Sequence, residues 1–316
     1  MRICFIGHFT SGGTERATFL VANGLKEQHD IFLVNTCDRQ PSFYLKEGIN
    51  MEYLPSGNIP KRVLALVRYL KKRKIDILIT VEALTGIVSV PAAMLTRCKH
   101  IVWEHANYFQ NQGSRYIQKV RQIELKTADA YVVLTKKDLK NFQQHFLCKT
   151  TVEQIYNIAD GRNSNVYDED SKTIVSAGHI WKIKNFIVIP DLAKVVFEKH
   201  PDWKWIIYGN ATGEEYEKIL RKVQEYGLEQ NIIFYGRCEN MESEYQKAAM
   251  YVMTSLQEGL PMVLLEAKSN GLPLVSFDIE TGPSEIIRDG ENGFLVPPYD
   301  IECMEEKICR LIEDND

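Results

Sequence analysis

Two glutamates in the last quarter of the chain carry the clearest chemical signal in the sequence. Glu258 and Glu266 are separated by seven residues in SLQEGLPMVLLEA. The apolar pattern places Glu258 on a loop after a strand and Glu266 on the first or second turn of the next helix. Gly259 and Leu260 would bring backbone N–H groups to the start of that helix, where anions bind well. Because carboxylates accept hydrogen bonds from hydroxyls, the pattern predicts a pocket for a sugar diol beside a diphosphate. Two solvated glutamates at the start of a helix are the plainer alternative.

A glycine-rich loop near the amino end is a second candidate. The segment GHFTSGGTER follows an apolar strand and opens a helix, so Gly12 and Gly13 would let a ligand approach the backbone closely. The spacing differs from the GxGxxG fingerprint of dinucleotide-binding folds, and Asn35 stands where an acid would end the second strand. These departures disfavour an NAD-dependent dehydrogenase or epimerase. A tight turn without a ligand explains the loop equally well.

The elements that must position these residues alternate along the chain. Apolar strand-like runs alternate with amphipathic helical patterns, which predicts βαβ units and parallel sheets. The alternation breaks in the polar stretch 159–172, which we interpret as a linker between a domain over 1–158 and a domain over 173–316. The sequence thus predicts two Rossmann-like domains, whose ligands bind at the carboxyl ends of the strands. The strands are expected at 2–6, 31–35, 75–81, 101–103, 130–134, 173–176, 205–208, 232–235, 250–254, 274–277 and 293–296.

The composition limits the class of protein. The chain has 316 residues, 45% of them hydrophobic, and a net charge of −4. There is no broad basic surface to predict a nucleic-acid partner. The seven cysteines are scattered, without zinc-ligand spacing, as expected in a reducing compartment. No signal peptide or run of about 18 apolar residues is visible, and we therefore expect a cytoplasmic protein.

The segment from Lys61 to Lys74 is basic and interleaved with apolar residues. A helix of this kind can rest on anionic lipid head groups. A helix that packs its apolar face on the core and exposes its charges is the simpler interpretation.

Several segments together give a resemblance to a known family. The text from EGLPMVLLEAKSNGLPLVSFD through TGPSEIIRDGENGFLVPPYD, the segment SAGHIWKIKNF and the amino-terminal SGGTERATFLVANGL resemble the retaining family-4 glycosyltransferases. That family has the GT-B fold, with two Rossmann-like domains facing across an interdomain cleft. The resemblance covers nearly the whole chain. It implies an acceptor-side domain first and a nucleotide-sugar donor domain second, the latter without the family's usual final helices.

The resemblance assigns roles in the donor domain. It implies that Glu266 binds the ribose hydroxyls, that Glu258 contacts the donor sugar, and that the amides of Gly259 and Leu260 face the sugar hydroxyls or the phosphates. Lys184 would neutralise the diphosphate, which gains charge as the bond breaks. The family's second phosphate-binding cation, an arginine, is replaced by His179, so that contact is weaker or pH-dependent, or is taken over in part by Lys182.

Other positions match less closely. His105, in the segment WEHAN, would contact the donor hexose as a third catalytic residue beside Glu258 and Lys184, or be a structural histidine. Gly12 and Gly13 would close on the donor phosphates or the acceptor. Gly209 would lie near the nucleotide and Arg237 near its base, although Asn210 departs from the family's loop.

The activity implied is transfer with retention at the anomeric carbon, without a metal ion or cofactor. The donor would be a nucleotide sugar, UDP-linked, carrying a hexose or an N-acetylhexosamine. The acceptor would be a glycan or a polyprenyl-linked glycan, reached from the cytoplasm, with the basic segment meeting the inner face of the membrane. A catalytically weak nucleotide-sugar-binding protein is the alternative, because His179 replaces the arginine.

Overall fold

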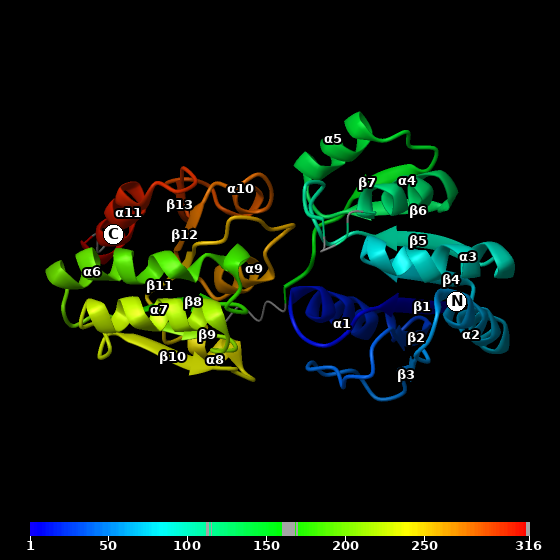
Figure 1. Cartoon of the computed structure of the whole chain (residues 1–316), viewed down its shortest axis with the longest axis horizontal. Helices are drawn as coiled ribbons and strands as arrows, with labels where there is room; N and C mark the ends of the chain where they lie inside the picture. Colours follow the sequence, from blue (N-terminus) through cyan, green and yellow to red (C-terminus); the bar gives the residue numbers. More distant parts are fainter. Residues whose placement is uncertain (112–113, 115, 160–167, 169, 314–316) are drawn as a thin grey trace. The chain divides into compact units, whose positions relative to one another are not determined.

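The computed structural model describes residues 1–111, 114, 116–159, 168 and 170–313. The chain divides into two compact units, Met1–Ile158 and Ala159–Asp316 (Figure 1). Most of the predicted linker over 159–172 lies outside the described residues. Each unit is therefore considered by itself.

The described part of the first unit contains a parallel sheet of seven strands in the order β3-β2-β1-β4-β5-β6-β7. Its strands are β1 (Arg2–Gly7), β2 (Asp30–Asn35), β3 (Asn50–Tyr53), β4 (Ile77–Val81), β5 (Lys99–Trp103), β6 (Ala130–Val133) and β7 (Thr151–Gln154). Its helices are α1 (Gly13–Leu25), α2 (Ile59–Arg73), α3 (Gly86–Thr96), α4 (Ile117–Thr127) and α5 (Lys136–His145), with a 3-10 turn over Ala83–Thr85.

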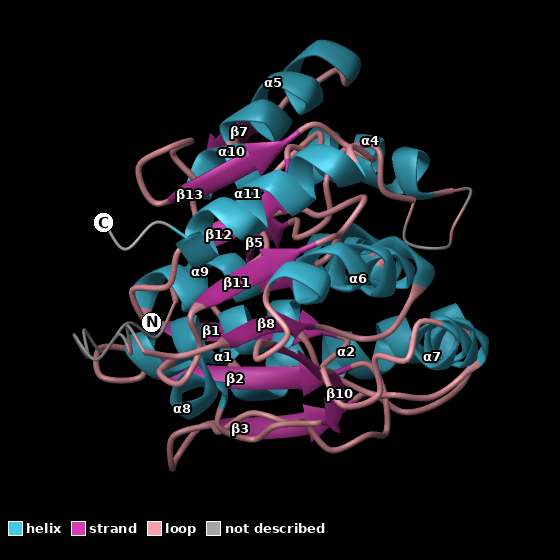
Figure 2. Cartoon of the chain, turned by 90° about the vertical axis from the view of Figure 1, so that its left-hand side faces the viewer, coloured by secondary structure: helices cyan, strands magenta, loops and turns pink. Residues whose placement is uncertain are grey.

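The second unit repeats the plan, with six parallel strands among its described residues in the order β10-β9-β8-β11-β12-β13. Figure 2 shows β8 and β11 side by side in this sheet. The strands are β8 (Thr173–Ala177), β9 (Lys204–Tyr208), β10 (Ile232–Gly236), β11 (Met250–Met253), β12 (Leu274–Phe277) and β13 (Gly293–Val296). The helices are α6 (Ile189–Lys199), α7 (Glu214–Glu225), α8 (Met241–Tyr245), α9 (Met262–Ser269), α10 (Pro283–Ile286) and α11 (Ile301–Glu313), with 3-10 turns over Lys182–Lys184 and Phe186–Val188.

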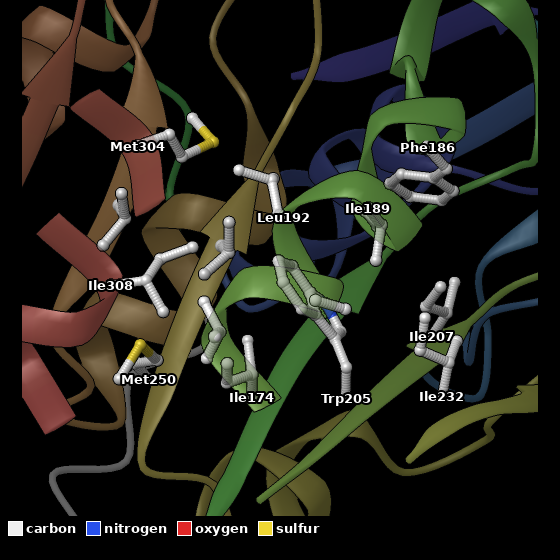
Figure 3. Packing of buried hydrophobic residues seen from close by; sticks show 14 of the residues in the cluster. Ile174, Phe186, Ile189, Leu192, Trp205, Ile207, Ile232, Met250, Met304 and Ile308 are labelled. Carbon is white, nitrogen blue, oxygen red and sulfur yellow. The ribbon is translucent and has the colours of Figure 1, made fainter. Parts of the chain in front are cut away.

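Each unit has its own hydrophobic core. In the second, Trp205 on β9 is completely buried and belongs to one cluster with Leu192 and Ile189 of α6 and Ile308 of α11 (Figure 3). In the first, Cys4 and Ile6 of β1 pack with Leu66 of α2 and Ala92 of α3. Strands covered by helices on both faces read as continuous apolar runs, which is why the central strands were predictable.

All eleven predicted strands are present, to within one or two residues at their ends. The strands that sequence reasoning missed are β3 and β7, which form the two edges of the first sheet. Each is four residues long, and of these eight residues only Val152 is buried. An edge strand that buries little side-chain area leaves almost no hydrophobic pattern to detect.

The strand orders fix where ligands can bind. In the first sheet β2 lies on one side of β1 and β4 on the other, and in the second β9 and β11 flank β8 in the same way. The loops that leave β1 and β4, or β8 and β11, therefore diverge and open a crevice at the carboxyl ends of the strands. These two switch points are where site residues are expected.

Candidate active site

The turn after β8 is built by close approach of main chains. The N–H of Gly178 donates to the carbonyl of Tyr208 (2.9 Å), and the N–H of Gly209 donates to the carbonyl of Gly236 (2.8 Å). A Cβ atom on Gly209 would lie 1.9 Å from the carbonyl oxygen of Gly178, and its φ is 146°. Only glycine fits there, so Gly209 holds the ends of β8 and β9 together. Gly209, which was expected to lie near the nucleotide, is thus found at the contact between the ends of β8 and β9.

Lys184 and Glu258 meet across the switch point of the second sheet. Lys184 ends the turn after β8, Glu258 lies on the loop after β11, and Nζ is 2.6 Å from Oε1. Two hydrogen bonds set this register: Leu256 N–H donates to the Ile183 carbonyl, and the Thr254 hydroxyl donates to the Lys184 carbonyl, each at 2.9 Å. The side chains are 21% and 14% exposed, so the pair is accessible to a ligand.

Glu266 lies on the second turn of α9, as predicted, and is 5% exposed. The hydroxyl of Tyr245 donates to its Oε2 at 3.3 Å. The helix begins at Met262 after Pro261. Gly259 and Leu260, both buried, immediately precede Pro261 and the start of the helix.

The loop that carries Glu258 packs against Thr281 and Gly282. These two residues belong to the segment TGPSEII, to which the sequence analysis assigned no role. The hydroxyl of Thr281 donates to the Glu258 carbonyl at 2.6 Å. A Cβ on Gly282 would lie 2.5 Å from Pro261 Cδ and 2.7 Å from the Gly259 carbonyl oxygen. Thr281 and Gly282 thus fix the position of this loop. In the sequence, only the turn-forming Thr-Gly-Pro indicated that the segment is structurally important.

His179 does not stand as a fixed positive charge. Its ring stacks on that of Trp181, with centroids 5.1 Å apart and planes at 19°. Burial lowers the pKa of His179, and the nearby charges of Lys184 and Arg237 lower it further. The imidazole is therefore mostly neutral at neutral pH. Arg237 itself is exposed on the loop after β10.

In the first unit the glycine-rich loop has the predicted position. Gly12, at φ 111°, caps α1, and Gly13 is the first residue of the helix. Asn35 closes the base of this loop, because its Oδ1 accepts from the Phe9 N–H (3.0 Å) and its Nδ2 donates to the Phe9 carbonyl (2.7 Å). The asparagine that replaces the acid of dinucleotide-binding folds thus has a structural role.

His105 follows β5 at the carboxyl edge of the first sheet and is 8% exposed. Burial lowers its pKa to about 3, so the ring is neutral. It packs on Trp103, with centroids 4.5 Å apart. Its Nε2 is buried and has no hydrogen-bond partner within the described part of the chain, an arrangement that leaves this atom available to a ligand.

A buried ion pair that sequence reasoning missed fixes the loop around His105. Arg121 of α4 and Glu104 have side chains with no exposed surface, and Nε is 2.9 Å from Oε2. The same guanidinium donates to the carbonyls of Tyr108 (2.8 Å) and Asn107 (3.1 Å). One arginine thus orients the loop over residues 104–108. No motif in the sequence indicates that Arg121 of α4 contacts this loop.

The described residues contain no group of three or more His, Cys, Asp or Glu side chains arranged to hold a metal ion. Nor does any described helix have the length and apolar character needed to cross a bilayer.

Comparisons with known proteins agree with this organisation. The profile of the glycosyl transferases group 1 matches residues 157–316, and that of glycosyltransferase family 4 matches residues 11–160. An uncharacterised glycosyltransferase of Haemophilus influenzae is 31% identical, over 96% of this chain and 88% of its own length. The amylovoran biosynthesis glycosyltransferase AmsD of Erwinia amylovora is 27% identical, over 97% and 88%.

Among solved structures, Anabaena HepE in complex with UDP and glucose superposes with a TM-score of 0.85. It is 18% identical and covers 99% of this chain and 90% of its own. A likeness at this identity concerns the fold, and it confirms the predicted GT-B architecture of two parallel-sheet, Rossmann-like halves. Given the group 1 profile over half of the chain and the Haemophilus relative over nearly all of it, the chain belongs to the glycosyl transferases of group 1.

Proposed function

We propose that this protein is a retaining glycosyltransferase that moves a hexose or an N-acetylhexosamine from a UDP-sugar to a glycan or lipid-linked glycan. The observation that carries the proposal is the Lys184–Glu258 pair, 2.6 Å apart at the switch point of the second sheet. Glu266 lies on the helix that follows. The relation to an amylovoran biosynthesis enzyme and to a structure holding UDP and glucose supports the class of donor and acceptor. Retention rests on the family resemblance.

Donor binding exchanges the partners of Lys184. A diphosphate carries more negative charge than one carboxylate, so Lys184 turns from Glu258 to the phosphates. Glu258 is then released to accept hydrogen bonds from the donor sugar, while Glu266 takes the ribose hydroxyls. As the bond to the anomeric carbon breaks, charge builds on the diphosphate, and Lys184 stabilises it.

His105 belongs to this proposal as a neutral hydrogen-bonding group. With a pKa near 3, it does not donate a proton as an imidazolium at neutral pH. Its Nε2 would instead bond a sugar hydroxyl. Gly12 and Gly13 offer backbone N–H groups at the start of α1, and Gly209 and Arg237 lie at the same sheet edge as Lys184.

Metal independence is also part of the proposal, because Lys184 and backbone amides supply the positive charge that a divalent cation supplies elsewhere. Activity should then be unchanged in EDTA. Loss of activity in EDTA, restored by Mg²⁺ or Mn²⁺, would contradict this point.

A catalytically weak nucleotide-sugar-binding protein is the second candidate. The depressed pKa of His179 favours it, since the imidazole supplies little charge to the leaving group. Turnover distinguishes the glycosyltransferase from the binding protein. A binding protein would bind the UDP-sugar but release no UDP, even when acceptors are added.

We place the protein in the cytoplasm, with α2 as a peripheral contact to the inner face of the membrane. The helix buries Leu66, Val67 and Leu70 in the core, as the simpler interpretation requires. Its outer face also carries an apolar side chain, Leu64, which is 49% exposed. The exposed cations of this surface, called here the α2 stripe, are Lys61, Arg68, Lys71 and Lys72. Basic and apolar groups on one helix face suit an anionic bilayer.

The proposed function is tested by thermal stabilisation of the purified protein with UDP, GDP, ADP and NAD. A ligand that binds the native state raises the melting temperature. We expect UDP to raise it and Glu266→Ala to abolish that increase. Stabilisation by NAD and by none of the nucleoside diphosphates would overturn the glycosyltransferase assignment.

A further inference from the structure

A carboxylate stands at the switch point of the first sheet, where sequence reasoning placed none. Glu82 follows β4, and the hydroxyl of Thr14 on α1 donates to its Oε1 at 3.0 Å. Thr14 belongs to the glycine-rich loop and helix that follow β1, and β1 is the neighbour of β4. The hydrogen bond therefore spans the crevice in which sheets of this kind bind their ligands.

The backbone of Glu82 is in a conformation that few side chains adopt. Its φ is 66° and its ψ 135°, a combination that costs free energy for any residue with a Cβ. The main chain is held on both sides: its N–H donates to the Trp103 carbonyl (3.0 Å), and its carbonyl accepts from the Thr85 N–H (3.1 Å). A glycine would be unstrained here. A strained carboxylate at a ligand crevice indicates a functional group.

The neighbours of Glu82 distinguish it from Glu104, a buried acid of the same unit. Glu104 is committed to the guanidinium of Arg121. Glu82 has a hydroxyl as its partner, which a ligand hydroxyl can join or replace at little cost. On the next strand, β5, the buried Nε2 of His105 is unpaired among the described residues. The carboxyl ends of β1, β4 and β5 thus present a hydroxyl, a carboxylate and an imidazole along one edge.

We propose that Glu82, held by Thr14, is a subsite for the acceptor sugar and accepts hydrogen bonds from its hydroxyl groups. The inference rests on the proposed function and adds a prediction about which acceptor sugars the site prefers. A carboxylate favours neutral hexoses and N-acetylhexosamines, whose hydroxyls donate to it. It disfavours uronic acids, because their own carboxylates would face Glu82 in a site of low dielectric.

The test uses the full chain, saturated with UDP, at a pH of about 8.5, where the Glu82 carboxyl is ionised. Binding is measured by saturation-transfer NMR with four probes: the methyl α-glycosides of glucose, galactose, N-acetylglucosamine and glucuronic acid. We expect at least one neutral glycoside to bind, and the glucuronide to bind at least about tenfold more weakly. Glu82→Gln keeps the size of the side chain but removes its charge. It should weaken the neutral glycoside about tenfold and improve the glucuronide, a reversal that general damage to the fold would not produce. Thr14→Val should weaken the neutral glycoside less than Glu82→Gln, and the exposed Glu47→Gln should match the wild type.

Several results would overturn the inference: equal binding of neutral and acidic glycosides by the wild type, identical probe binding by wild type and Glu82→Gln, or no probe bound by a wild type that UDP stabilises. UDP stabilisation is measured on every variant. If Glu82→Gln abolishes it, the residue serves the donor or the fold, and the inference fails. If UDP does not stabilise even the wild type, the proposed donor site fails, while the reversal between neutral and acidic probes still tests Glu82 separately.

Discussion

Lys184 and Glu258 form one ion pair, yet substitutions at the two residues should affect UDP binding in opposite directions. Lys184→Ala removes the cation and should weaken UDP binding by about 10- to 100-fold, the range for hydrogen bonds to charged groups. Glu258→Gln removes a competitor for Lys184 and a negative charge near the diphosphate, so UDP should bind as tightly as before or more tightly. Calorimetric titration measures both, with Lys199→Ala, at the exposed end of α6, as the matched control.

The two variants should nevertheless share a loss of turnover. Glu258→Gln should also lose the extra affinity of a UDP-sugar over UDP, because that increment comes from the sugar hydroxyls. If Glu258→Gln weakens UDP as much as Lys184→Ala does, the exchange of partners on donor binding is wrong.

Glu82 gives a pH-dependent prediction. Burial, together with the nearby carboxylate of Glu104, raises its pKa to about 7, although the hydrogen bond from Thr14 opposes the change. Between the ordinary carboxyl pKa of about 4.3 and pH 7, the native state holds a proton that the unfolded state has released. The stabilisation from this proton is complete below that range and is lost as the pH rises through it.

Glutamine does not titrate, so Glu82→Gln should gain melting temperature relative to the wild type as the pH rises from 5 to 8. We expect a gain of a few degrees. Taking the difference between the two proteins cancels the contributions of groups that do not interact with Glu82. The Glu47→Gln control should show no trend, and a constant difference across the pH range would mean that Glu82 is ionised throughout.

At the scale of elements, the contact between the ends of β8 and β9 is the most sensitive to a single methyl group. Gly209→Ala would place a Cβ 1.9 Å from the Gly178 carbonyl oxygen at a φ of 146°. Because main chain cannot yield as a flexible side chain does, we expect a loss of at least about 2 kcal/mol in the free energy of unfolding.

Gly24→Ala is the matched control. Gly24 lies in α1, and a Cβ there would have no atom within 4 Å. Alanine in a helix should stabilise by about 0.5–1 kcal/mol. Chemical denaturation measures both variants, and a neutral Gly209→Ala would show that the two turns can separate.

Helix α2 makes a prediction about membranes. Replacing Lys61, Arg68 and Lys72 of the α2 stripe by glutamine should reduce sedimentation with vesicles rich in phosphatidylglycerol several-fold, since each cation near an anionic surface contributes about 1 kcal/mol. Binding to phosphatidylcholine vesicles should be weak for both proteins. Arg73 should be left intact, because it pairs with Glu52 at 2.7 Å. Equal sedimentation of wild type and variant would remove α2 from the membrane contact.

The sequence predicted those features of the fold that leave a pattern of apolar residues. The central strands are continuous apolar runs, and the positions of Lys184 and Glu258 after strands and of Glu266 in the following helix could be predicted. The edge strands β3 and β7 bury too little to leave a pattern. Glu82 looked like a polar residue after a strand, because its significance comes from a backbone angle and from Thr14, 68 residues away in the chain.

For the whole molecule, the two cores predict separable unfolding. The hydrophobic clusters of the first unit and of the second are formed by different residues. Because Lys184, Glu258 and Glu266 all belong to the second unit, UDP should stabilise the transition of that unit more than that of the first. Scanning calorimetry of the full chain should resolve two components, of which UDP moves one upward. A single transition that shifts as a whole would show that the two units unfold cooperatively.

The buried guanidinium of Arg121 has a consequence for anyone who would transplant the loop that bears His105. The loop that bears His105 takes its shape from a helix later in the chain, through Glu104 and the carbonyls of Asn107 and Tyr108. A segment transplanted from a relative would arrive without the arginine that shapes it, or would leave that arginine buried without its carboxylate. The transferable module is therefore loop and helix together, residues 104–127, and chimaeras cut between them should be recovered mainly as misfolded protein.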